Sequence, residues 1–202
     1  MLAAIILAGG ESRRMGTPKA LLEFRGRTFL EHLLDTARHP RVGSRRVVLG
    51  AVEDEVLARV KLSPEEIVLN PDWRQGQLSS LQAGLRSLPP GTEGAIVFPV
   101  DHPLVSAELV ASLISAFDRC AEPIVVPVYE GRRGHPVIFR ATLYEELLRA
   151  PVDIGARAVV RAHANEVCEV PTTERGVVLN MNEPEDLNSA LEQEHLRESE
   201  TN

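Results

Sequence analysis

Residues 2–19, which read LAAIILAGGESRRMGTPK, join an apolar run to a loop rich in glycine and basic residues. The run Leu2–Leu7 is continuous, as is typical of a strand buried on both faces of a parallel sheet. The three glycines that follow let backbone N–H groups approach an anion closely. Lys19 adds a compact positive charge in a chain that has 20 arginines but only two lysines. The loop therefore predicts a polyphosphate ligand rather than an ordinary turn, with a spacing that fits neither a P-loop nor a dinucleotide fingerprint.

Apolar runs alternate with amphipathic stretches along the rest of the chain, which predicts an α/β, Rossmann-like three-layer fold with a mostly parallel sheet. The predicted strands after the first are 45–49, 66–69, 94–100, 123–129, 135–139 and 166–171. The predicted helices are 28–38, 53–60, 79–88 (with a serine as cap), 107–117 and 143–149. Two of the strands, within Pro123–Phe139, are expected to form a small hairpin-like β excursion that carries part of an acceptor site. We expect one catalytic domain, residues 1–188, and an acidic, frayed tail, residues 189–202.

The net charge of −7 argues against binding to nucleic acid or to an anionic membrane. Most of it lies at the end of the chain, where residues 183–202 hold seven acids and one base. Residues 1–27 hold five bases against two acids, so a local positive charge surrounds the glycine loop. Cys120 and Cys168 form no C-x-x-C motif and are interpreted as buried or incidental thiols of a reducing compartment. With no basic leader or long apolar segment in the sequence, we expect a cytoplasmic protein.

Asp101 follows the apolar run 94–100, so it is expected at the same sheet edge as the glycine loop. One carboxylate there suffices for Mg²⁺, which keeps several waters and bridges phosphate oxygens. The alternative is a helix cap, but Ser106 is the better cap for the next helix. His102 is interpreted as a neighbour of the site, because histidine suits Mg²⁺ poorly.

The segment Leu-Ala-Gly-Gly-x-Ser-x-Arg-Met-Gly-x-x-Lys-Ala-Leu-Leu, residues 7–22, resembles the signature of the molybdenum cofactor nucleotidyltransferases. Three further segments extend the resemblance: residues 70–81 after the third strand, residues 131–137 with Gly-His-Pro, and residues 180–187. Gln77 stands where the family has Met, and His102 stands where it often has Gln or Met. The glycine loop and the asparagines at 180 and 182 are typical of guanylyl members, whereas Gly-His-Pro and Asp-x-Gly-Ala-Arg (residues 153–157) are typical of cytidylyl members.

The resemblance implies roles for individual residues. The catalytic set is Arg14, Lys19 and Asp101. The nucleotide-binding set is Leu7, Ala8, Gly9, Gly10, Gly16, Lys19, Asn70 and Ser80. The acceptor-binding set is Arg132, Arg133, His135 and Asn182, and the metal-binding set is Asp101 and Asn182.

Structural roles stay open beside several of these assignments. Asn70 can be a turn residue, Ser80 a helix cap and His135 a structural histidine. Asn182 can bind the metal, bond the acceptor phosphate or end a turn. Asp153 and Arg157, four residues apart, can simply pair with each other.

The implied function is Mg²⁺-dependent transfer of a nucleoside monophosphate from an NTP, CTP before GTP, to a molybdopterin-type phosphate acceptor, with release of pyrophosphate. Transient contact with a molybdoenzyme or its chaperone is part of the same expectation. The alternatives are a guanylyltransferase on that cofactor and an NTP transferase for a sugar phosphate or another small acceptor. A nucleotide-binding regulator or cofactor carrier is the alternative without catalysis.

Overall fold

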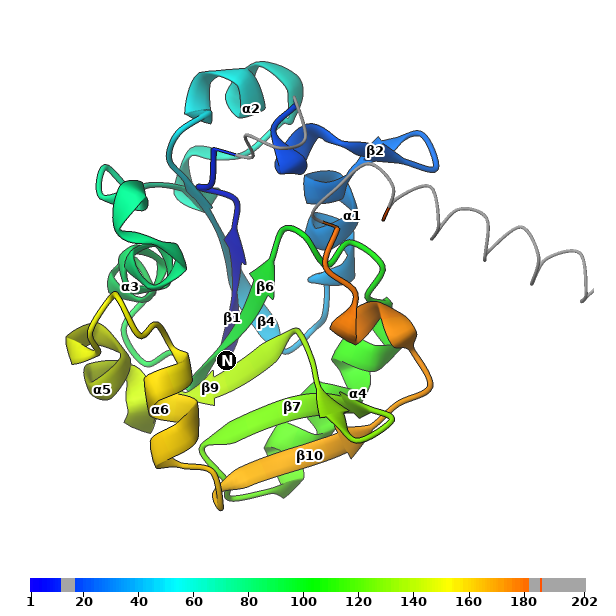
Figure 1. The fold of residues 1–202 in the computed structure, drawn as a ribbon, viewed down its shortest axis with the longest axis vertical. Helices are drawn as coiled ribbons and strands as arrows, with labels where there is room; N and C mark the ends of the chain where they lie inside the picture. Colours follow the sequence, from blue (N-terminus) through cyan, green and yellow to red (C-terminus); the bar gives the residue numbers. More distant parts are fainter. Residues whose placement is uncertain (12–16, 182–185, 187–202) are drawn as a thin grey trace, which may run out of the picture.

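A central sheet of eight strands organises the computed structural model, which describes residues 1–11, 17–181 and 186 (Figure 1). The strand order is β10-β7-β9-β6-β1-β4-β5, and the short β8 pairs with β7. The bounds are β1 Leu2–Leu7, β4 Val42–Leu49, β5 Ile67–Leu69, β6 Gly94–Pro99, β7 Ile124–Tyr129, β8 Arg132–Arg133, β9 Val137–Arg140 and β10 Val167–Pro171. The strands β2 (Glu23–Phe24) and β3 (Arg27–Thr28) form a separate small hairpin.

The long strands are parallel except for β9. β9 lies between β6 and β7 and is antiparallel to both, so β7 itself runs in the direction of β6. The mostly parallel sheet is thereby confirmed. The expected excursion at Pro123–Phe139 differs in detail: β7 and β8 do form a hairpin, but β7 and β9 belong to the main sheet. Both strands are buried apolar runs, and the sheet is where such runs find partners on two faces.

Helices cover both faces of the sheet (Figure 1). Their bounds are α1 Phe29–Thr36, α2 Glu53–Arg59, α3 Gln77–Arg86, α4 Ala107–Arg119, α5 Tyr144–Arg149 and α6 Arg157–Ala162. Ile6 of β1 packs in one buried cluster with α1 and α4, while Ile5 packs in another with α3, α5 and α6. Successive side chains of a strand point to opposite faces, so this one continuous apolar run supplies both cores.

Helix α3 begins earlier than expected. Gly76, at φ +101°, is its N-cap, so Ser79 is not the cap and lies within the first turn. Ser106, by contrast, caps α4 as predicted, because its side chain accepts the Leu109 N–H. Thr28 caps α1 together with Glu31 in a capping box.

Within the described part of the chain, none of the helices combines the length and the apolar character that a membrane crossing requires.

Candidate active site

Lys19 and Asp101, 82 residues apart in sequence, meet at the carboxyl ends of β1 and β6. Lys19 Nζ donates to Asp101 Oδ2 at 3.3 Å. Their side chains are 18 % and 23 % exposed, which leaves both accessible to a ligand. A cation and a carboxylate at this edge can serve two needs of a nucleotide, neutralisation of phosphate charge and binding of a divalent metal. The predicted proximity of the glycine loop and the acid is therefore confirmed.

The backbone of the loop after β1 is held by both neighbouring strands. Leu7 O accepts the Val100 N–H at 3.2 Å, and the Ala8 N–H donates to Val48 O at 2.9 Å. Gly9 O accepts the Ala51 N–H at 3.2 Å. These bonds fix the first half of the loop against the sheet edge. Three predicted site residues, Arg14, Gly16 and Asn182, lie outside the described residues.

Beneath Gly9, a buried polar network joins the end of β5 to the start of α3. Asn70 Nδ2 donates to Ser79 Oγ at 2.9 Å and to Ser80 Oγ at 3.0 Å, and Asn70 Oδ1 accepts the Asp72 N–H. Asn70 is 3 % exposed and Ser80 is 5 % exposed. A Cβ added to Gly9 would lie 3.1 Å from Ser80 Oγ. Asn70 and Ser80 thus support the loop from below, and their contact with a base or ribose stays a prediction.

Two histidines connect Asp101 to a neighbouring pocket. His102, 4 % exposed, contacts His135 with ring centroids 4.8 Å apart and the rings tilted by 53°, and its Nδ1 lies 3.3 Å from Gly176 O. Burial lowers the pKa of His102. Burial also lowers the pKa of His135, to about 4, and the nearby His102 contributes to this shift. His135 is therefore neutral at physiological pH. Among the described residues its buried Nδ1 has no hydrogen-bond partner.

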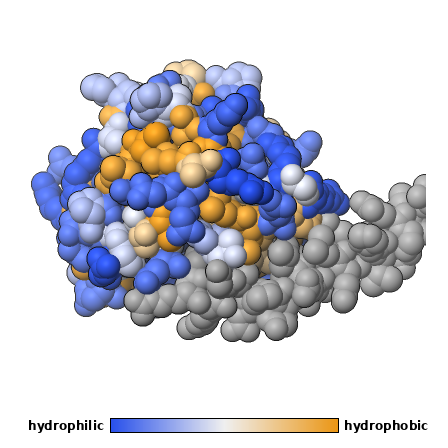
Figure 2. All heavy atoms as spheres, turned by 90° about the horizontal axis from the view of Figure 1, so that it is seen from above, coloured by the Kyte–Doolittle hydropathy of each residue, from blue (hydrophilic) through white to orange (hydrophobic). Residues whose placement is uncertain are grey.

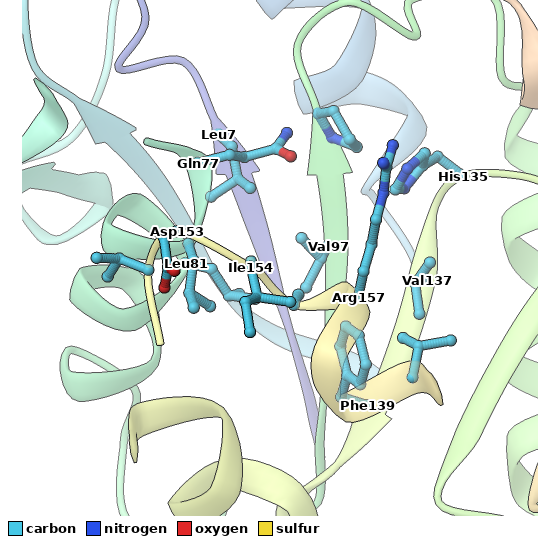
Figure 3. A pocket seen from close by; sticks show the side chains of 16 residues that line it. Leu7, Gln77, Leu81, Val97, His135, Val137, Phe139, Asp153, Ile154 and Arg157 are labelled. Atoms are coloured by element: carbon cyan, nitrogen blue, oxygen red, sulfur yellow. The ribbon is translucent and has the colours of Figure 1, made fainter. Parts of the chain in front are cut away.

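The pocket beside His135 has a volume of about 300 Å³ and a largely apolar wall (Figure 3). Leu7 of β1 and Val97 of β6 form its floor, and Leu81 of α3 and Ile154 face them. The polar residues that line it are Gln77, His135, Asp153 and Arg157. Figure 2 shows, from above, a group of hydrophobic residues on one face of the molecule that is bordered by hydrophilic residues. Such a wall with a few polar groups suits a small organic ligand.

The arginine that lines this pocket is Arg157 of the Asp-x-Gly-Ala-Arg segment, rather than Arg132 or Arg133, the arginines expected to bind the acceptor. Arg157, at the start of α6, points toward His135, whereas Asp153 lies on the other side of the pocket (Figure 3). The expected alternative, a pair between Asp153 and Arg157, is therefore not what the structure shows. Arg133 Nε donates to Glu169 Oε1 at 2.7 Å, on β10, which pairs with β7 as β8 does. Arg132 and Arg133 are exposed on β8, and their acceptor role stays a prediction.

The C-terminal part of the predicted motif also reaches this site. The Met181 N–H donates to Asp101 O at 2.9 Å, and Asn180 hydrogen-bonds His102. The segment that precedes Asn182 thus lies directly against Asp101.

Comparison with known proteins agrees with this geometry. The family model described as the MobA-like NTP transferase domain matches residues 4–167, which span β1 to the first residue of β10. The chain belongs to the MobA-like NTP transferase family. Its membership of the nucleotidyltransferases, expected from residues 7–22, is thereby confirmed.

Two curated relatives of this MobA-like transferase differ in their named activities. It is 30 % identical to the molybdenum cofactor guanylyltransferase of Rhizobium meliloti (strain 1021), over 93 % of this chain and 89 % of the relative. The chain is 33 % identical to the nicotine blue oxidoreductase of Paenarthrobacter nicotinovorans, over 79 % of this chain and 81 % of the relative. The relatives' names therefore agree on the family and diverge on the reaction.

Solved structures confirm the fold. The MobA-like transferase superposes on Rv0371c from Mycobacterium tuberculosis H37Rv with a TM-score of 0.81, at 30 % identity, over 95 % of this chain and 97 % of the other. A manganese complex of Rv0371C has a TM-score of 0.77 at 27 % identity, with 95 % and 98 % covered. A structure with this fold thus carries a divalent metal ion.

Proposed function

We propose that this MobA-like transferase moves a nucleoside monophosphate from an NTP to the phosphate of a molybdopterin-type acceptor. An acceptor phosphate oxygen forms a bond to the α-phosphorus, the bond from that phosphorus to the bridging oxygen breaks, and pyrophosphate leaves. The observation that carries the proposal is the 3.3 Å contact between Lys19 and Asp101 beside the glycine loop. This reaction needs alignment and charge neutralisation more than covalent catalysis.

The residues at the sheet edge have separable tasks in this scheme. The Gly9 and Gly10 backbone borders the phosphates, and the Lys19 ammonium neutralises charge that builds on the leaving pyrophosphate. Asp101 fits a hard divalent cation, because Mg²⁺ takes one or two protein carboxylates and completes its shell with water and phosphate oxygens. Such a cation, when bound, would add charge neutralisation at the phosphates. We expect Mg²⁺ in this role, held by Asp101 with help from Asn182.

The pocket beside His135 is assigned to the acceptor. It adjoins the Asp101 end of β6 through the His102–His135 pair, so a ligand in it would lie next to the phosphates. The apolar wall suits a flat ring, and Arg157 offers a cation to an acidic group of that ligand.

The identity of the NTP is argued from the relatives. Those named guanylyltransferases favour GTP as the donor to test first. CTP stays the prediction from the Gly-His-Pro and Asp-x-Gly-Ala-Arg segments.

The test is pyrophosphate release with each of the four NTPs, with and without molybdopterin. Lys19→Ala and Asp101→Ala should each lower the rate by about 10²–10³-fold while the protein stays folded, since each removes a charge contact made in the transition state. Lys61→Ala, at the chain's other lysine, is the matched control and should keep the wild-type rate.

Each competing function has its own outcome in this assay. Wild-type turnover by folded Lys19→Ala or Asp101→Ala would refute the mechanism. Pyrophosphate release only with a sugar phosphate would replace the acceptor. Nucleotide binding without any release would favour a regulator or carrier.

A further inference from the structure

The only two cysteines of the chain lie side by side although 48 residues separate them. Cys120 is the C-cap of α4, and Cys168 is the second residue of β10. The two Sγ atoms and a carboxylate oxygen of Glu122 all lie within 4.8 Å of one another. Both thiols are half-buried, so they are sheltered but reachable by a small solute. Nothing in the proposed transfer reaction uses these three groups.

This cluster is remote from the proposed active site. Cys168 pairs in register with Val125, near the amino end of β7, whereas Lys19 and Asp101 lie at the carboxyl edge of the sheet. Helix α4 starts at the carboxyl edge, after Asp101, and runs back to Cys120. The cluster therefore occupies the opposite edge of the sheet.

The loop that carries two of the three groups is held in place by Arg140 of β9. The Arg140 guanidinium lies 3.9 Å from the centre of the Phe117 ring and donates to the carbonyl oxygens of Phe117 and Cys120. Its Nε donates to Glu122 O at 2.9 Å. The backbone on both sides of the Cys120 and Glu122 side chains is thus fixed before any ligand binds, which lowers the entropy cost of binding.

The donor set selects a class of cation. Two thiols and one carboxylate are ligands typical of Zn²⁺, which binds sulfur at about 2.3 Å in a tetrahedron, whereas Mg²⁺ and Ca²⁺ prefer oxygen alone. Sulfur atoms in such a tetrahedron are about 3.8 Å apart. The three ligand atoms, all within 4.8 Å of one another, are near enough to share one such ion, and a water would fill the fourth position.

We propose that Cys120, Glu122 and Cys168 bind a thiophilic divalent cation of the Zn²⁺ class that joins the end of α4 to the edge strand β10. Binding breaks the two S–H bonds, forms two S–Zn bonds and releases the protons to solvent.

Cobalt(II) titration of the full-length, fully reduced chain tests the site, because only thiolate ligation produces an intense sulfur-to-cobalt charge-transfer band. Wild type should show the band with saturation at one cobalt per chain, and Zn²⁺ should displace it. Cys120→Ser and Cys168→Ser should each weaken the band and bind Zn²⁺ more than about 100-fold more weakly, since loss of a ligand costs more than loss of an outer partner, and the double variant should lose the band. Glu122→Gln should keep the band and weaken binding by about 10-fold or more.

Two controls separate this site from the proposed catalytic metal and from unfolding. Asp101→Asn should retain the full band, because Asp101 is not a ligand of this site. A second measurement is the rate at which both thiols of the wild-type protein are alkylated, which Zn²⁺ should lower. This measurement needs no substitution, so it remains informative if a serine variant fails to fold. Absence of the band in wild type, or equal Zn²⁺ affinity in the Cys120→Ser/Cys168→Ser double variant, would overturn the proposal. Isolation of a stable Cys120–Cys168 disulfide with no Zn²⁺ affinity after reduction would overturn it as well.

Discussion

At the scale of single residues, Gly9 and Gly10 are neighbours with opposite surroundings. A Cβ at Gly9 would lie 3.1 Å from Ser80 Oγ, which Asn70 holds in place, whereas nothing lies within 4 Å of a Cβ at Gly10. The open space beside Gly10 is where the proposed nucleotide would lie. The two glycines therefore differ in packing: Gly9 is in tight contact with Ser80, and Gly10 borders the space that we propose for the nucleotide.

This difference predicts distinct effects of two alanine substitutions. Gly9→Ala should lower the free energy of unfolding by about 1–3 kcal/mol, as overpacking of a filled site does. Gly10→Ala should change it by less than about 0.5 kcal/mol and instead raise the KM for the NTP. Urea denaturation and steady-state kinetics on both variants measure the two effects. Equal loss of stability in both would contradict the packing argument.

His135 makes stability depend on pH. Its pKa is about 4 in the folded protein and about 6.5 in the unfolded chain. The unfolded chain therefore binds more protons below pH 6.5, and stability is lost as the pH falls from about 6.5 toward 4. The charged or titratable groups that face His135 are His102, Asp101 and Arg157, and all three remain when His135 is replaced.

From pH 7 to pH 5, the single titration of His135 corresponds to a loss of about 2 kcal/mol in the free energy of unfolding. Between pH 7 and pH 5, the free energy of unfolding of His135→Gln should therefore fall by about 2 kcal/mol less than that of wild type. Urea denaturation with a chelator present measures this difference. Parallel pH profiles for the two proteins would contradict the assignment.

At the scale of elements, the network around Asn70 determines how α3 leaves the sheet. Asn70 follows β5, and its side chain makes three hydrogen bonds that span the turn into α3. Its amide is buried, and it provides the hydrogen bonds of the Ser80 hydroxyl and the Asp72 N–H, whereas the Ser79 hydroxyl also donates to Asp72 O and Gly76 O.

Asn70→Ala should cost about 1–3 kcal/mol of unfolding free energy, because it leaves buried polar groups without partners. Gln75→Ala is the matched control: it removes an exposed amide that bonds Asp72 in the same turn, and should cost less than about 0.5 kcal/mol. Equal costs would mean that burial of the network contributes nothing.

Elements were predicted well where the local pattern is strong. The continuous runs of β1 and β6 and the amphipathic α1 and α4 appear where the sequence places them, because burial on one or two faces leaves a clear period. Helix α6 was missed because it is only six residues long and follows an irregular segment. The place of β9 in the sheet was missed as well, since strand order depends on tertiary contacts that no local pattern contains.

Among the site residues, too, a local sequence pattern predicts some positions, and only tertiary contacts determine the others. Lys19 and Asp101 could be placed together because each follows a predicted parallel strand, and such ends share one edge. The bond between Asn70 and Ser80 and the approach of Arg157 to His135 arise only from packing between distant elements. The same holds for Cys120 and Cys168, which sequence reasoning treated as incidental.

At the scale of the whole molecule, charge is distributed by segment. Residues 189–202 contain four glutamates and one arginine, and the glycine loop is locally basic within a nearly neutral body. Removal of residues 189–202 should leave both the midpoint of urea denaturation and the rate of pyrophosphate release unchanged, because we assign this tail to neither the core nor the site. A large drop in either quantity would place the tail within the catalytic domain.

The position of β9 between β6 and β7 has a consequence for folding during translation. One edge of β6 has no partner until β9 emerges from the ribosome, about forty residues after β6 is complete. At synthesis rates of about 5–20 residues per second, that interval is roughly 2–8 s. During it, an apolar strand with free N–H and C=O groups is open to pairing with another nascent chain. The edge of β6 that later pairs with β9 therefore has to be protected from other chains during translation, although it is fully paired in the folded protein.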